Sequence, residues 1–174
     1  MNNQDKAKWC ERGQEDEQAF LAIAADYRLY LVEHPNKAGD IYETDYQLAN
    51  GLMDVDLKHV TTPFFKAGNY GYDPDYTVTF NHKDYIRYRY KYPEWGNDMA
   101  ILFWVEWDAQ TRFDVNVADI TGVWSLRLGH FDEMVRRGKL SCHSYLHRTG
   151  ESGTNAKHSW LVDLRGCTQH EKIL

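Results

Sequence analysis

The chain has 174 residues, which is enough for one domain with a hydrophobic core and too short for two domains of ordinary size. Its hydrophobic content of 43% and aromatic content of 14% exclude a disordered chain. A formal net charge of −6 argues against a protein that coats nucleic acid without selectivity, but it allows a nuclease, because metal-binding carboxylates add negative charge. We expect a flexible N-terminus over residues 1–13 and a single domain over 14–174.

The sequence indicates a cytoplasmic protein that does not cross a membrane. The longest apolar run, 99–105, has the length of a buried strand and is too short for a membrane span. The first residues lack the apolar core of a signal peptide. Cys10, Cys142 and Cys167 are odd in number and widely separated, which indicates a reducing compartment and no disulfide framework.

A helix is predicted to begin at Gln14 and to end near His34, where a proline follows. Three acidic residues stand in its first turn, where the helix dipole favours carboxylates. Glu17, the last of them, lies three and four residues before Phe20 and Leu21 and therefore on the same stripe. A carboxylate at the edge of a core-facing stripe needs a partner, although a first-turn charge is the simpler interpretation.

Two strands joined by a hairpin are predicted next. Residues 38–42 form the first strand, Asn50-Gly51 is a strong hairpin signal, and 51–60 form the second strand. Asp40 and Asp56 then fall on neighbouring antiparallel strands.

In the second strand, alternation places Asp54, Asp56 and Lys58 on one face. The simplest interpretation is an edge strand with a charged outer face. Two carboxylates beside an ammonium also suit a divalent cation and a water molecule.

After a long loop, a strand over 77–80 leads into a helix over 81–92. Arg87, Arg89 and Lys91 alternate with tyrosines in this helix, which is typical of a nucleic-acid surface and equally of an ordinary amphipathic helix. Further elements are strands at 99–105, 113–117 and 123–128, a helix at 130–138 and a hairpin at 141–164. Arg148 and Lys157, near the tip of this hairpin, are further candidates for DNA contact.

The absence of their motifs weighs against several common site classes. The sequence has no Cys-x-x-Cys or His-Glu-x-x-His pair, and the spacing of four between His143 and His147 on a strand is not a zinc signature. A P-loop, a Rossmann glycine motif and a Gly-x-Ser-x-Gly elbow are also absent.

The carboxylates point to a different chemistry. Glu17 on a helix, Asp40 on one strand and Asp56 with Lys58 on the next provide the hard oxygen ligands that Mg²⁺ prefers. A metal that polarises a phosphate and supplies hydroxide, with a cation beside it, is what phosphodiester hydrolysis needs. We therefore predict Glu17, Asp40 and Asp56 as metal ligands and all four residues as catalytic.

This arrangement resembles the PD-(D/E)xK, or restriction-endonuclease-like, nuclease superfamily over residues 14–60. Here Gly39 precedes Asp40 where the family often has proline. Glu15 and Asp16 compete with Glu17 for the helix position. Two further aspartates bear on the site, Asp45 as a rival of Asp40 in the hairpin loop and Asp54 as a supplementary ligand.

The resemblance implies an α/β fold with a mixed central β-sheet flanked by helices, here followed by the C-terminal β-hairpin. It implies cleavage of DNA by a homo-oligomeric, Mg²⁺-dependent endonuclease in which Mn²⁺ substitutes. The alternative is a non-catalytic regulatory protein that binds nucleic acid or protein. A third interpretation, a β-rich carbohydrate or peptide binder, rests on the aromatic residues alone.

Overall fold

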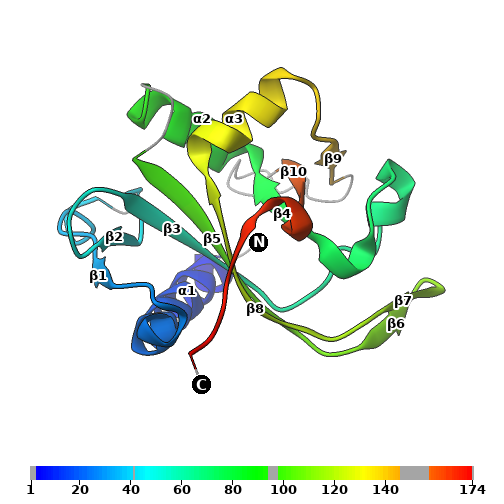
Figure 1. The fold of residues 1–174 in the computed structure, drawn as a ribbon, viewed down its shortest axis with the longest axis horizontal. Coiled ribbons are helices and arrows are strands. Elements are labelled where there is room, and N and C mark those ends of the chain that lie inside the picture. Colours follow the sequence, from blue (N-terminus) through cyan, green and yellow to red (C-terminus); the bar gives the residue numbers. More distant parts are fainter. Residues whose placement is uncertain (1–2, 41, 94–97, 146–156, 174) are drawn as a thin grey trace.

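The computed structural model describes residues 3–40, 42–93, 98–145 and 157–173, and a six-stranded sheet forms its centre (Figure 1). The order of the strands is β1-β2-β3-β5-β8-β11. Their bounds are β1 Leu31–Glu33, β2 Tyr46–Leu48, β3 Asp54–Val60, β5 Met99–Trp107, β8 Ile120–Arg127 and β11 Thr168–His170.

The central sheet is mixed. β3 and β5 run parallel, whereas β1-β2, β2-β3, β5-β8 and β8-β11 are antiparallel pairs. Parallel neighbours require a crossover, and here it contains β4 (Thr77–Asn81) and α2 (His82–Lys91). The α/β fold with a mixed central sheet is therefore confirmed.

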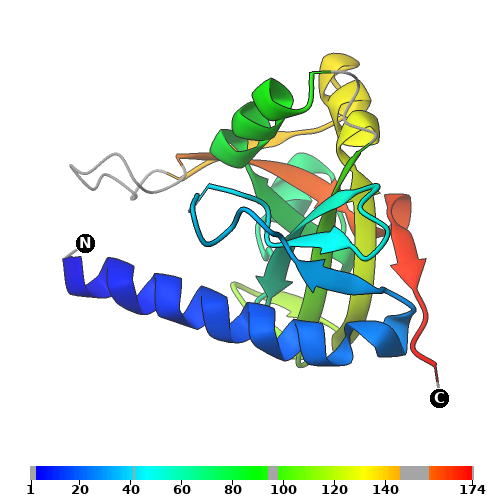
Figure 2. The ribbon, with the colours of Figure 1, turned by 90° about the vertical axis from the view of Figure 1, so that its left-hand side faces the viewer.

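Helices flank the sheet, as Figure 2 shows: α1 (Asn3–Ile23) runs along one face, and α2 and α3 (Leu128–Arg136) lie beyond the other. A second, three-stranded sheet of β4, β10 (His158–Asp163) and β9 (Cys142–Ser144) packs on the side of α2 and α3. The antiparallel pair β9-β10 confirms the C-terminal hairpin, although most of its tip lies outside the described residues. A small hairpin joins β6 (Gln110–Arg112) to β7 (Val115–Val117).

Each face of the central sheet packs into a separate hydrophobic cluster. Toward α1, Leu57 and Trp104 pack around Phe20. Toward α2 and α3, Phe103 and Tyr88 belong to a larger cluster. The apolar run of β5 is buried on both faces, as continuous hydrophobic strands usually are. Among the described residues, none of the helices combines the length and apolar composition that a membrane crossing needs.

The first helix differs from its prediction at both ends. It begins at Asn3 and not at Gln14, and it ends at Ile23. A short 3-10 helix, η1 (Ala24–Tyr27), follows, and Arg28 then adopts a left-handed conformation with φ of 59° that turns the chain away from the helix. The apolar residues that continue the helical spacing beyond this turn belong in part to strand β1.

The strand predicted at 38–42 is wrong, because the described residues of this segment form turns. The predicted hairpin does form, with Gly51 at φ of 71° in its turn, but the partner of β3 is β2. Two further 3-10 turns, η2 (Ala67–Tyr70) and η3 (Pro74–Tyr76), lie in the predicted loop before β4, and η4 (Leu164–Gly166) precedes β11.

Candidate active site

The site forms where β2 stops covering β3. β2 has three residues, and its ladder with β3 reaches only Asp54 and Val55. The next backbone donor on that edge, the amide of Leu57, donates to the carboxylate Oδ2 of Asp45 at 2.7 Å. Asp45 directly precedes β2, so its side chain takes over where the strand ladder ends and lies beside the middle of β3.

Asp56 and Lys58 lie on the face of β3 that is turned toward α2. The Lys58 Nζ lies 2.6 Å from Asp56 Oδ2 and 3.4 Å from Asp84 Oδ2 on α2. The hydroxyl of Tyr88 donates to Asp56 Oδ1 at 2.5 Å. Asp56 is only 4% exposed, so α2 supplies both the partner of its carboxylate and the second carboxylate for Lys58.

Glu17 reaches the same edge from α1. The ammonium of Lys37, in the turns between β1 and β2, contacts Glu17 Oε2 and lies 2.5 Å from Asp45 Oδ1. The buried Tyr46 donates its hydroxyl to the Glu17 carbonyl at 2.5 Å, which fixes this turn of the helix to β2. Five residues therefore form one carboxylate–lysine cluster: Glu17, Lys37, Asp45, Asp56 and Lys58.

Burial and neighbouring charges shift the pKa values of the residues in the cluster. Burial raises the pKa of Asp56, an effect that Lys58 opposes and the negative charge of Asp45 increases. Burial likewise raises the pKa of Asp45, again opposed by Lys58 and increased by Glu17. Burial disfavours the charge of Lys58, but Asp56 and Asp84 outweigh it and raise the pKa of Lys58 well above its usual value. The structure therefore holds a protonated lysine beside carboxylates that repel one another.

A groove gives access to the cluster. It encloses about 660 Å³ between α1 and the C-terminal half of β3. Its wall on the α1 side contains Arg12, Asp16 and Glu17, and its opposite wall contains Lys58 and the two threonines that follow β3. A cavity of this size is large enough for a small ligand or part of a polymer.

The cluster offers the type of ligand that a hard divalent cation takes, but Glu17, Asp45 and Asp56 are not, among the described residues, a set of three whose ligand atoms all lie within 4.8 Å of one another. Asp56 is buried, and the partner of its Oδ2 is the Lys58 ammonium at 2.6 Å. Together with Asp45 and Glu17, Asp56 offers carboxylate oxygens, the ligands that Mg²⁺ and Mn²⁺ take in proteins.

A second group, His34, Glu43 and Asp54, places its ligand atoms within 4.8 Å of one another and could hold a metal ion. Its members already have partners: Lys91 contacts Glu43, and Tyr92 donates to Asp54. The Nδ1 of His34 accepts the backbone N–H of residue 36 at 3.3 Å, which places the ring proton on Nε2, the nitrogen that faces the carboxylates. A metal at Nε2 would have to displace this proton.

The structure gathers three of the four predicted catalytic residues, Glu17, Asp56 and Lys58, and leaves Asp40 in an exposed turn. There Asp40 accepts the backbone N–H of Tyr42 at 2.8 Å. Asp45, the rival of Asp40, joins the cluster in its place.

The remaining acidic candidates lie outside the carboxylate–lysine cluster. Glu15 is exposed, and Asp16 pairs with His59 Nδ1 at 3.1 Å. Asp54 accepts the amide of Gln47 at 3.0 Å and belongs to the second group.

The predicted DNA-binding residues have varied surroundings. Arg89 pairs with the buried Asp132 at 2.6 Å, and Lys91 contacts Glu43, so both tie α2 to the protein. Arg87 is half-buried and pairs with acidic Asp84 on the same helix. Two lie elsewhere: Lys157 is exposed, and Arg148 is outside the described residues. Their role in binding DNA stays a prediction.

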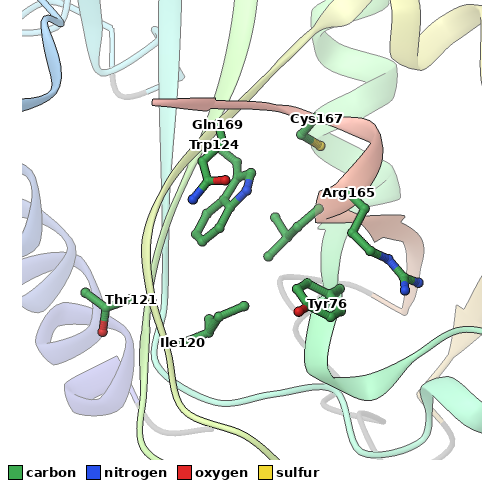
Figure 3. Close-up of a pocket in the computed structure, with 8 residues that line it drawn as sticks. Tyr76, Ile120, Thr121, Trp124, Arg165, Cys167 and Gln169 are labelled. Carbon is green, nitrogen blue, oxygen red and sulfur yellow. The ribbon is translucent and has the colours of Figure 1, made fainter. Parts of the chain in front are cut away.

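A separate cavity of about 340 Å³ lies between β8 and the segment η4–β11 (Figure 3). Trp124, Ile120 and Tyr76 form much of its wall. The cation among its described lining residues, Arg165, pairs with Asp163 at 2.6 Å. The described lining contains no carboxylate, the ligand type that a hard divalent cation takes in proteins.

No family model matches the sequence, and no curated protein matches it either. A solved structure, described as D212, a nuclease from a fusselovirus, aligns with a TM-score of 0.42 and 11% sequence identity. The alignment covers 92% of this chain and 81% of that chain.

Proposed function

We propose that the protein is a metal-dependent nuclease that hydrolyses phosphodiester bonds of DNA. One observation carries this proposal: the open edge of β3 gathers the three carboxylates and Lys58 beside a groove. The PD-(D/E)xK pattern consists of a Glu on a helix, an Asp near one strand and Asp-x-Lys on the strand after it. We propose that the chain belongs to this superfamily, with Asp45 in the position that the sequence suggested for Asp40.

Asp45, Asp56 and Glu17 would hold Mg²⁺ or Mn²⁺, which when bound polarises a phosphate and activates water. Lys58 stays protonated between its two carboxylates and faces the groove, where it stabilises negative charge that develops on the phosphate. Tyr88 holds Asp56 in one orientation, so the carboxylate is positioned before any ligand arrives.

The substrate would enter through the groove beside the cluster. Arg12 on α1 is exposed there and suits a phosphate of the backbone, since guanidinium groups bind phosphate through paired hydrogen bonds. Cleavage of both strands by a homo-oligomer, each protomer cutting one strand, stays a prediction.

Plasmid, linear and branched DNA incubated with Mg²⁺ or Mn²⁺ test the proposal. Asp45→Asn and Asp56→Asn should each lower the cleavage rate at least about a hundredfold, because each removes a charged ligand. The matched control is Asp40→Asn, which changes an exposed carboxylate and should cleave within about twofold of the wild type. Cleavage that survives the double substitution Asp56→Asn with Lys58→Met would refute the proposal.

The ion pairs within the cluster support a second candidate function, that of a non-catalytic binding protein. Lys37 and Lys58 neutralise the carboxylates of the cluster, as they would in a structural ion-pair network. In that case the protein is a non-catalytic binding protein. It then gives no heat on titration with Mg²⁺, and Asp56→Asn changes its stability without changing any DNA cleavage.

A further inference from the structure

Lys37 contacts two of the three carboxylates that we assign to the metal. Its ammonium touches Glu17 Oε2 and lies 2.5 Å from Asp45 Oδ1, and its side chain is 18% exposed. A lysine placed in this way neutralises the same oxygens that a divalent cation requires. Since a second cation within a few ångströms would repel the ammonium, the metal and the bound ammonium compete for these oxygens.

The two lysines of the cluster differ in how many of the proposed metal ligands they contact. Lys58 contacts one proposed ligand, Asp56, and also Asp84 on α2, so it keeps a carboxylate partner when the metal takes Asp56. Lys37 contacts Glu17 and Asp45, which are both proposed ligands. Binding of the metal therefore removes both of these ion pairs from Lys37.

The segment that carries Lys37 lies outside the strand ladders. Residues 35–39 lie in turns between β1 and β2. Backbone hydrogen bonds in this segment are local: Lys37 donates to the carbonyl of His34 at 3.0 Å, and Gly39 to that of Asn36 at 3.0 Å. Displacement of the lysine side chain consequently leaves the strand ladders intact.

We propose that Lys37 is a tethered counter-ion, which holds Glu17 and Asp45 in the metal-free protein and is displaced when a divalent cation binds. The inference rests on the proposed function, because it assumes that these carboxylates bind the metal. It adds regulation of the site: the protein lowers its own metal affinity, and metal binding frees a lysine beside the proposed ligands Glu17 and Asp45.

Calorimetric titration with Mn²⁺ tests the competition. Lys37→Met should bind Mn²⁺ about tenfold or more tightly than the wild type, because the metal no longer displaces a charge-assisted contact. Lys37→Arg, which keeps the charge, should bind no more tightly than the wild type. The matched control is Lys172→Met, which removes a surface lysine paired with Asp26 at 3.6 Å and should leave the affinity unchanged.

A second measurement uses the wild-type protein, so it does not depend on the folding of a variant. Acetylation of lysines, followed by peptide mass spectrometry, should label Lys37 slowly in metal-free protein and faster after Mn²⁺ is added. Labelling of the exposed Lys172 should not change.

The outcomes separate the two proposals. If Mn²⁺ binds in a manner that Asp56→Asn abolishes, while Lys37→Met binds no more tightly or Lys37 labelling does not rise, the counter-ion inference is overturned and the nuclease proposal stands. If Mn²⁺ binds neither the wild type nor Lys37→Met, both proposals are overturned.

Discussion

The hydroxyl of Tyr88 gives the most direct test of how the site is held together. It donates to Asp56 Oδ1 at 2.5 Å, and both residues are buried. Tyr88→Phe removes this donor and keeps the ring, which stacks near Phe80 with centroids 6.5 Å apart, so no large cavity arises. Arg87, which also donates to the hydroxyl, keeps its bond to Asp84.

A hydrogen bond to a charged group contributes about 1.5–3 kcal/mol, and its loss here leaves a buried carboxylate oxygen without its donor. We expect the free energy of unfolding to fall by about 2 kcal/mol. For a chain of this size the melting temperature then falls by roughly 4–8 °C, at about 2–4 °C per kcal/mol.

Urea denaturation followed by circular dichroism, together with calorimetry, measures the effect. The control is Tyr90→Phe in the same helix, whose side chain is 84% exposed and whose hydroxyl should contribute little. A loss below about 0.5 kcal/mol for Tyr88→Phe would refute the reasoning, since a change of that size is typical of surface positions.

Three further predictions concern other parts of the structure. The folded-state pKa of Lys58 is raised well above its unfolded value, so its contribution to stability is complete below about pH 10 and is lost as the pH rises further. The urea midpoint should therefore fall above about pH 10, and less steeply in Lys58→Met; an equal slope would contradict this. Burial raises the pKa of Cys167 to about 12, so iodoacetamide should label the exposed Cys142 faster than Cys167 in peptide mapping, whereas equal rates for the two would contradict the burial argument. Arg89→Met should lower the free energy of unfolding by about 1.5–3 kcal/mol, because it removes a partner of the buried Asp132; unchanged stability with weaker DNA binding would instead support the predicted DNA contact.

The long elements could be predicted from the sequence because their patterns are local. Alternation in β3 placed Asp56 and Lys58 on one face, and both prove to face α2. The continuous apolar run identified β5, and the boundaries of α2 agree with the predicted helix within a residue or two.

Three-residue strands gave no comparable signal. β1, β2 and β11 are too short to show a period, and each forms because a neighbouring strand supplies hydrogen bonds. Since the start of β2 could not be located, the sequence favoured Asp40, and Asp45 was only its rival in the hairpin loop. The role of Lys37 depends on the folding of turns over the edge of the sheet, which no spacing in the sequence encodes.

The parallel pairing of β3 with β5 also affects how the protein is made. All five residues of the carboxylate–lysine cluster precede residue 60, but β5, the parallel partner of β3, begins at Met99. Asp56 pairs in register with Ile101 of β5 and is buried in the folded protein. A nascent chain that ends before Met99 therefore contains every residue of the cluster and cannot assemble it. Assembly of the cluster thus requires a contact between segments that are far apart in the sequence.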